Sequence, residues 1–238
     1  MKKLTTIILL SVITVITFSC KKAINGEGPL VSQTRSLPSF TGIDLRIPGD
    51  VYYKNDTVRK VEVIAQQNIL DRIETFVSGN TLTIKFFGSG DFRDAADIRI
   101  NISGPNLNGF VLNTAGSIYC MNDIQASNIY LRSSGSGSIY LQRVTAELID
   151  AETSGSGSIN ASLGTATREQ LKTIGSGPIS LAGISARTVI AQTNGSGSIR
   201  VKVSDHLNAR INGSGFIYFN GYPSITQDVS GSGKLIRF

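Results

Sequence analysis

Aliphatic and polar residues alternate in short runs along the second half of the chain, and each run follows a Gly-Ser-Gly tripeptide. Alternation with a period of two predicts a β-strand with one buried face. A second alternation lies later in each copy, so each repeat is expected to hold two short strands and a glycine-rich corner. The tripeptides recur every 18–20 residues, and a degenerate first copy at 115–117 extends the range to 21. The complete copies are Gly135–Gly137, Gly155–Gly157, Gly175–Gly177, Gly195–Gly197, Gly213–Gly215 and Gly231–Gly233.

The apolar positions of successive copies align. The first inward position is Ile118, Ile139, Ile159, Ile179, Ile199, Ile217 and Leu235; the second is Cys120, Leu141, Ala161, Leu181, Val201 and Phe219. The later alternation is Ile129/Leu131, Ile149/Ala151, Val189/Ala191 and Leu207/Ala209, and the third copy weakens it with Glu169 before Leu171. Equivalent strands would stack in parallel about 4.8 Å apart. The pattern therefore predicts an all-β fold, a parallel β-helix with coils of 18–21 residues over 113–238.

An outward ladder supports this register, because charges of opposite sign mostly alternate along it. Its members are Arg132, Glu152, Lys172, Gln192, Arg210 and Asp228. A flexible Gly/Ser linker is disfavoured because regular apolar residues separate the tripeptides, and no copy completes a phosphate-binding glycine motif. We expect the glycines to supply positive φ and close backbone approach at the corners. The middle serines are expected to form a hydrogen-bonding stripe, with a serine-lined binding groove as the alternative.

Residues 37–112 carry β signals without this period. Ser78-Gly79-Asn80 lies between two strand-like runs, which predicts a hairpin. Gly49-Asp50-Val51-Tyr52 resembles Gly137-Ser138-Ile139-Tyr140 in the repeats, so this half is interpreted as an elaborated early coil. Because an open first coil exposes strand edges, we expect residues 37–112 to cap the solenoid.

Residues 1–20 have a basic start and an apolar run, the pattern of a secretory signal peptide. The run ends at Ser19-Cys20, which looks like a loose bacterial lipobox. Lipidation of Cys20 would hold the protein to a membrane without a spanning segment, and residues 21–36 would be a polar tether. The alternative is an uncleaved signal anchor. The lipoprotein interpretation places the protein in a bacterial cell envelope, as an outer-membrane lipoprotein whose periplasmic or surface face is left open.

Composition narrows the function classes. Removing residues 1–20 leaves 21 basic and 17 acidic residues, a net charge of +4. The basic residues are dispersed, so no nucleic-acid partner is expected. Cys120 takes an inward position and is interpreted as a small buried hydrophobe. His206 is the single histidine and has no Cys or acidic partner at ligand spacing, so no metal or other cofactor is expected.

The chain resembles the head GIN-domain family, described as putative auto-transporter adhesin-like proteins. The resemblance covers roughly 28–233 and is carried by Phe40-Thr41-Gly42-Ile43-Asp44-Leu45, Gly49-Asp50-Val51-Tyr52, Gly79-Asn80-Thr81-Leu82 and the Gly-Ser-Gly coils. It departs from the family at Pro48-Gly49-Asp50, where the family tends to have Gly-x-Gly-Asp. The resemblance implies β-helical secreted or envelope proteins, often lipoproteins, whose function is largely unproven. The fold alone therefore does not identify the function.

Three function classes follow. The first is a non-catalytic, adhesin-like module that binds a glycan or another surface component through an outward strip with Tyr119, Tyr140, Tyr218 and Arg200. The second is a β-helical polysaccharide-active enzyme, which needs clustered acids; no catalytic residue is assigned because the acids are scattered. The third is a structural or assembly protein, since the last coil ends without a cap and would allow a homo-oligomer.

Overall fold

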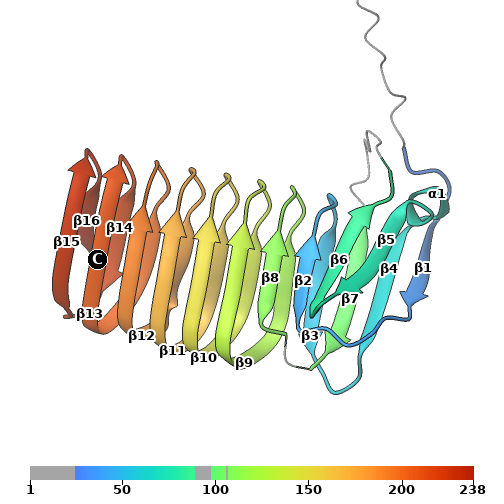
Figure 1. Ribbon diagram of the computed structural model, residues 1–238, viewed down its shortest axis with the longest axis horizontal. Helices are drawn as coiled ribbons and strands as arrows, with labels where there is room; N and C mark the ends of the chain where they lie inside the picture. Colours follow the sequence, from blue (N-terminus) through green and yellow to red (C-terminus); the bar gives the residue numbers. More distant parts are fainter. Residues whose placement is uncertain (1–24, 89–97, 106) are drawn as a thin grey trace, which may run out of the picture.

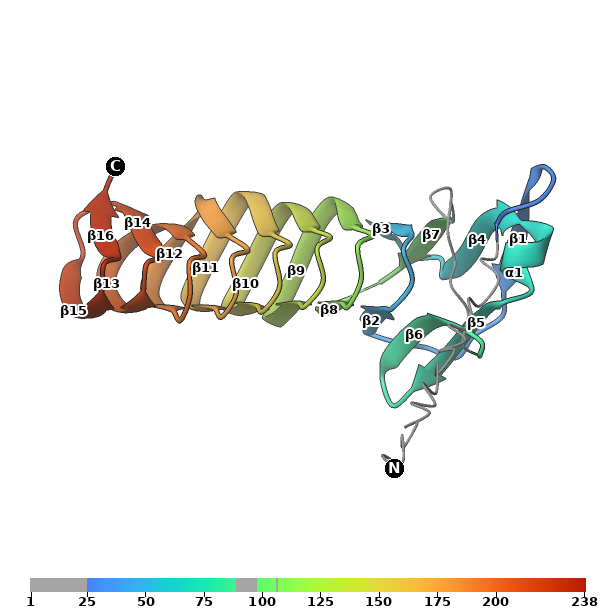
Figure 2. The same cartoon turned by 90° about the horizontal axis from the view of Figure 1, so that it is seen from above.

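The computed structural model describes residues 25–88, 98–105 and 107–238. The protein is all-β, with 68% of the described residues in strands, and it forms a parallel β-solenoid of about six turns. Figure 1 shows the coils stacked in sequence order from β8 to the C-terminus, and Figure 2 shows the same stack from above. The predicted fold class is confirmed.

Each central coil is one long bent strand. The strands are β9 (Ile118–Ser133), β10 (Ile139–Thr153), β11 (Ile159–Thr173), β12 (Ile179–Thr193) and β13 (Ile199–Gly213). The prediction of two separate short strands per coil is wrong in this respect. The bend stays paired with the next coil, as Val144 with Gly164 in β10 and β11. The next coil can therefore accept and donate the backbone hydrogen bonds around the bend, and the ladder of paired residues continues through it.

The last coil is built from three shorter strands. They are β14 (Phe216–Asn220), β15 (Ser224–Gly231) and β16 (Lys234–Arg237). β14 pairs with the start of β13 and β15 with its end, while β16 adds to β14. Among the described strands, β15 pairs only with β13 and β16 only with β14. Ile225 and Val229 align with buried Leu207 and Ile211, yet they are exposed because no described strand stacks on them.

The core runs along the inside of the solenoid as ladders of aliphatic side chains. All the predicted inward residues from Ile118 to Ile217 are buried, and the isoleucines of the first inward position are fully buried. Ser133, Thr153, Thr173 and Thr193 form an inward ladder beside the corners that the alternation did not single out. Burial of this continuous apolar column is the dominant stabilising contribution.

The corner glycines are required mainly by the stacking of coils. A Cβ on Gly157 would collide with the carbonyl oxygen of Gly137 in the preceding coil. The predicted close approach is therefore confirmed. Positive φ occurs within the tripeptides only at Gly213 and Gly231, so that part of the prediction is wrong for the earlier copies. The middle serines are exposed, and in the described part of the chain one side-chain hydrogen bond links two of them, Ser196 and Ser214.

The N-terminal strands cap the stack and extend it. They are β1 (Leu30–Arg35), β2 (Gly42–Leu45), β3 (Asp50–Asn55), β4 (Lys60–Gln66), β5 (Ile73–Ser78), β6 (Thr81–Phe86), β7 (Arg99–Gly104) and β8 (Gly109–Leu112), with the single turn α1 (Gln67–Leu70). β1 lies in the segment predicted as a tether; it pairs antiparallel with β4. β5 and β6 form the predicted hairpin around Gly79.

The continuous sheet bends around the core, so that it forms two opposing sheets. The site described below lies on the first of them. The first sheet contains β1, β4, β7, β3, the starts of β9–β13, β14 and β16; the second contains β5, β6, β2, β8, the ends of β9–β13, and β15. Val51 and Tyr52 of β3 align with Ile118 and Tyr119 of β9. The interpretation of Gly49–Tyr52 as part of an early coil is therefore confirmed.

Candidate functional site

The outer surface of the first sheet, here called the first face, carries three outward positions per coil. From β9 onward these are Ser117/Tyr119/Met121, Ser138/Tyr140/Gln142, Ser158/Asn160/Ser162, Pro178/Ser180/Ala182, Ser198/Arg200/Lys202, Phe216/Tyr218/Asn220 and Lys234/Ile236/Phe238. None of these side chains is acidic. At about 4.8 Å for each of six steps, this surface is about 29 Å long.

The middle position of each coil forms a row, here called the strip. In register it reads Tyr52, Tyr119, Tyr140, Asn160, Ser180, Arg200, Tyr218 and Ile236. The four residues predicted for the binding strip therefore all lie on one line, because parallel pairing without a net slip keeps equivalent residues on the same side. Tyr52 was not predicted for this line, although its Gly-Asp-Val-Tyr motif was the available signal.

Three tyrosines at the N-terminal end of the strip are stacked on one another. The ring centroids of Tyr52 and Tyr119 are 5.1 Å apart, and those of Tyr119 and Tyr140 are also 5.1 Å apart with an interplanar angle of 6°. The Arg99 guanidinium lies 5.0 Å from the centre of the Tyr52 ring and continues the stack. Both faces of Tyr119 are thus covered, whereas Tyr140 is 41% exposed and ends the stack.

A polar segment follows Tyr140. The hydroxyl of Ser158 donates to that of Ser138 at 2.8 Å, and the side-chain amide of Asn160 donates to Ser158 Oγ at 2.7 Å. Ser180 is half-buried beside them. These groups offer hydroxyl and amide hydrogen bonds next to the open side of Tyr140.

Aromatic and basic side chains gather at the C-terminal end of the first face. This cluster, here called the terminal patch, consists of Arg200, Lys202, Phe216, Tyr218, Lys234 and Phe238. The Arg200 guanidinium lies 4.4 Å from the centre of the Tyr218 ring and 5.9 Å from that of Phe238. Phe216 and Tyr218 are stacked with centroids 6.0 Å apart. Of this cluster, only Arg200 and Tyr218 were predicted; the others became neighbours through the pairing of β13, β14 and β16.

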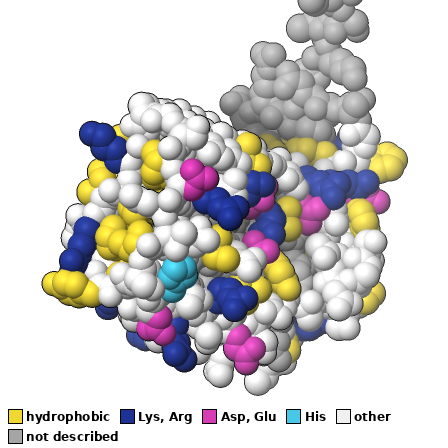
Figure 3. All heavy atoms as spheres, turned by 60° about the vertical axis from the view of Figure 1, so that its left-hand side comes forward, with side chains coloured by type: hydrophobic (Ala, Val, Ile, Leu, Met, Phe, Trp, Pro, Cys, Tyr) yellow, Lys and Arg dark blue, Asp and Glu magenta, His cyan; other side chains and the backbone are white. Residues whose placement is uncertain are grey.

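The end of the solenoid next to this patch is also apolar and basic. Figure 3 looks toward this end and shows hydrophobic side chains interspersed with Lys and Arg and with some Asp and Glu. A groove of about 510 Å³ is lined by Ser185, Ala186, Arg187, Lys202, Val203, Ser204, Gly221 and Tyr222. Lys202 therefore belongs both to the terminal patch and to this groove. The Arg237 guanidinium lies 3.5 Å from the centre of the exposed Tyr222 ring.

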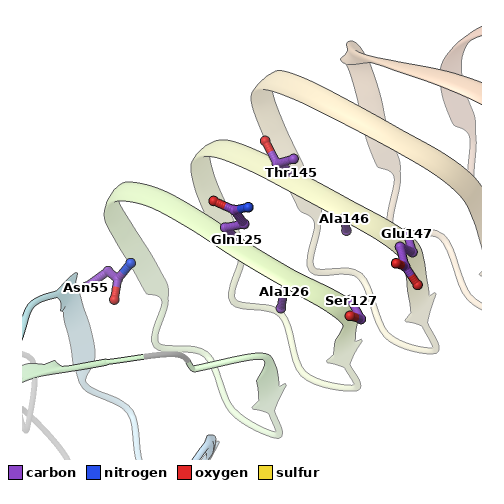
Figure 4. A pocket seen from close by; sticks show the side chains of 7 residues that line it. All are labelled: Asn55, Gln125, Ala126, Ser127, Thr145, Ala146 and Glu147. Carbon is purple, nitrogen blue, oxygen red and sulfur yellow. The ribbon is translucent and has the colours of Figure 1, made fainter.

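A second groove of about 590 Å³ lies where β3 meets the first coils. Figure 4 shows its residues on three successive strands: Asn55 of β3, Gln125, Ala126 and Ser127 of β9, and Thr145, Ala146 and Glu147 of β10. The lining is polar, and Glu147 is its one ionisable side chain. This groove offers hydrogen-bonding groups and no pair of acid and base.

The acidic side chains of the solenoid lie away from the first face and are mostly engaged. Asp150 accepts a hydrogen bond from Arg132 at 2.9 Å, and the Glu152 carboxylate lies 3.7 Å from Lys172 Nζ. Asp205 is paired with Arg187 at 3.0 Å. Within the described ranges, no three His, Cys, Asp or Glu side chains are grouped so as to hold a metal ion. His206 hydrogen-bonds Ser224 at 2.9 Å.

Two ionisable groups are buried in the core. Cys120 is buried as predicted, and burial raises the pKa of its thiol. Glu169 aligns with Ile149 and Val189 in an inward ladder, is fully buried, and has no hydrogen-bond partner for either oxygen. Desolvation raises the pKa of the Glu169 carboxyl well above its ordinary value. Both groups are closed to solvent and offer no surface chemistry.

The family description "Putative auto-transporter adhesin, head GIN domain" matches residues 39–223. The chain belongs to this family. The matched segment spans β2 to the turn after β14 and so includes both the cap and the repeated coils, which confirms the resemblance seen in the sequence. No curated protein matches the chain.

Solved structures of similar proteins have the same fold. A putative adhesin from Bacteroides fragilis is 25% identical, with a TM-score of 0.85, and the match covers 91% of this GIN-domain chain and 100% of that chain. A putative adhesin from Parabacteroides merdae is 20% identical with a TM-score of 0.72, covering 91% and 99%. A structure called a putative lipid binding protein, from Parabacteroides distasonis, is 22% identical with a TM-score of 0.72, covering 91% and 100%.

Two findings bear on the membrane. Among the helices of the described residues, none is long and apolar enough to cross a bilayer. Cys20 and the signal peptide predicted over 1–20 lie outside the described residues, as does the start of the predicted tether.

Proposed function

We propose that this GIN-domain protein is a non-catalytic, adhesin-like module of the bacterial cell envelope that binds carbohydrate along its first face. Membership of the family supports an envelope location and an adhesin-like role. The single observation that carries the carbohydrate proposal is the strip, which aligns exposed and half-buried aromatic, hydroxyl, amide and guanidinium groups on a rigid surface. Aromatic rings with polar tips are suited to recognition on such scaffolds.

The geometry sets how a sugar would lie. The rings of Tyr119 and Tyr140 are stacked on each other, so the two cannot both present a flat face to one saccharide. The open side of Tyr140 adjoins Asn160 and Ser180, whose polar atoms suit sugar hydroxyls. Coils spaced by about 4.8 Å match the length of one sugar in an extended chain, so a polysaccharide would run along the strip from Tyr140 toward Tyr218.

The proposed anchor is a lipid on Cys20, which would make the protein an outer-membrane lipoprotein. This proposal rests on the basic start, the apolar run and the Ser19-Cys20 junction. The tether that follows would leave the strip free to meet an external ligand.

A glycan array with the soluble chain tests the carbohydrate proposal. We expect at least one glycan to bind wild type and to be lost from Tyr140→Ser. Tyr130→Ser is the matched control, because Tyr130 is 43% exposed and Tyr140 41%, but Tyr130 lies on the second sheet. Equal binding by both variants would move the site away from the strip, and a folded wild-type protein that binds no glycan would end the proposal.

A second candidate function, assembly through the C-terminal coil, is favoured by one observation. Ile225 and Val229 occupy inward positions and are 45% and 43% exposed. A second copy could cover them and pair with the free edge of β15. Sedimentation analysis should then show an oligomer that Val229→Asp converts to monomer; a wild type that is monomeric at high concentration would refute it.

A further inference from the structure

Charge is divided unequally along the solenoid. Residues 25–159 contain fourteen acidic and eleven basic residues, whereas 160–238 contain eight basic and three acidic residues. One of those three acids, Glu169, is sealed in the core. The C-terminal third therefore presents an excess of positive charge, while the preceding part is weakly negative. A surface field of one sign attracts ligands of the opposite sign.

Much of this positive charge is uncompensated. Lys172 and Arg187 pair with Glu152 and Asp205, but the structure shows no carboxylate within ion-pair distance of the three cations of the terminal patch among the residues it describes. Those cations are Arg200, Lys202 and Lys234. They share the first face, which has no acidic side chain from Ser117 onward.

The same patch holds its cations against aromatic rings. The Arg200 guanidinium lies over Tyr218 and beside Phe238, which fixes the direction of its N–H donors. Phe238 is 51% exposed, and Lys202 and Lys234 are exposed on either side. Apolar rings next to fixed cations suit a ligand that has both C–H faces and anionic groups.

We propose that the terminal patch binds an acidic polysaccharide, with sugar rings against Tyr218 and Phe238 and anionic groups on Arg200, Lys202 and Lys234. This rests on the proposed function and specifies its ligand class. The polymer would continue along the strip over Ser180 and Asn160. The strip therefore has a polarity, with an anion-binding end at the C-terminus and an aromatic, uncharged end at Tyr140.

An anionic lipid surface is the competing partner, and the layout of the molecule favours the polysaccharide. Figure 2 places β16 and β1 at opposite ends of the elongated fold. The segment that precedes β1 leads to the proposed lipid anchor at Cys20, so the terminal patch would point away from the membrane that holds the protein.

The test compares polygalacturonate with its fully methyl-esterified form, which keeps the sugar chain and removes the charge. Binding of the soluble chain is measured by biolayer interferometry at low and high salt. We expect tighter binding to polygalacturonate, weakened by salt. The double variant Arg200→Gln/Lys202→Gln should lose about tenfold or more in affinity, since hydrogen bonds to charged groups are removed.

The matched control is Arg168→Gln/Arg210→Gln, which removes two exposed cations from outside the first face. Its affinity for polygalacturonate should stay within about threefold of wild type, and melting curves should show that both double variants fold. An equal loss in the two double variants would refute the patch, because only net charge would then matter. Equal binding to both polymers, weakened by Tyr140→Ser, would overturn the acidic ligand while leaving the carbohydrate function intact. Failure to bind either polymer, or binding only to phosphatidylglycerol vesicles, would also overturn it.

Discussion

Replacing Glu169 with valine should stabilise the protein, which makes it an informative perturbation. Glu169 aligns with Ile149 and Val189, so valine matches the ladder and has a similar volume. The carboxyl is fully buried, neither oxygen has a partner, and burial raises its pKa well above the ordinary 4.5. Between the two pKa values, the folded state therefore holds a neutral acid that the unfolded chain ionises.

The magnitude depends on pH. Between the ordinary pKa of 4.5 and the raised pKa of the folded state, keeping this carboxyl protonated costs about 1.36 kcal/mol for each pH unit. Its unsatisfied hydrogen bonds cost about 1–3 kcal/mol more. Below pH 4.5 only the second cost remains. Because the folded state binds the extra proton, wild-type stability should fall as pH rises from 4.5 toward the raised pKa.

Urea unfolding followed by circular dichroism at pH 4.5, 5.5 and 7 tests this. The free energy of unfolding of Glu169→Val should exceed that of wild type by about 1–3 kcal/mol at pH 4.5. This advantage should grow by about 1.4 kcal/mol for each pH unit up to the raised pKa of the folded-state carboxyl. Glu147→Val, an exposed control, should stay within about 0.5 kcal/mol at each pH. A Glu169→Val advantage that does not grow with pH, or a loss of stability, would show that the carboxyl is solvated or partnered in solution.

Two further predictions concern the core and the anchor. Ile179→Asp should destabilise the fold by several kcal/mol, because Ile179 is fully buried and an unpaired carboxylate would enter the ladder. The neighbouring outward substitution Ser180→Asp should change the melting temperature little. Similar melting curves for the two variants would contradict the register. Mass spectrometry of membrane-extracted protein should find a lipid-modified N-terminus at Cys20, and an unmodified chain beginning elsewhere would exclude the anchor.

The repeated coils were predictable because their stabilising contacts repeat with the sequence. Once Ile139 is placed inward, equal spacing places Ile159 and Ile179 inward as well, and Tyr119 and Tyr140 outward. The N-terminal half was less predictable, because its order in space departs from its order in sequence. β8 follows β7 along the chain, but it pairs with β2 and β9. Such long-range pairing leaves no periodic signal.

The alignment of the candidate residues was predicted, but the arrangement of their side chains was not. Equal spacing gave the line that contains Arg200 and Tyr218, but it gave no orientation for the rings. Stacking of Tyr119 against Tyr140 depends on side-chain rotamers that alternation does not encode. Phe238 joins the terminal patch only because β16 pairs with β14. This pairing depends on the last two coils being shorter than the others. Tyr52 belongs to the stack through β3, which pairs with β9 across a long insertion.

The central claim is that a saccharide lies on the strip, and the chain's seven tyrosines allow a direct measurement. The protein would be labelled with ring-¹³C tyrosine and titrated with a galacturonate oligosaccharide, with the methyl-esterified form as the second probe. We predict shifts in the ring resonances of Tyr140 and Tyr218, and none at Tyr130 on the second sheet or at buried Tyr53. Shifts confined to Tyr130, or no shift of any tyrosine on addition of either saccharide, would contradict the account.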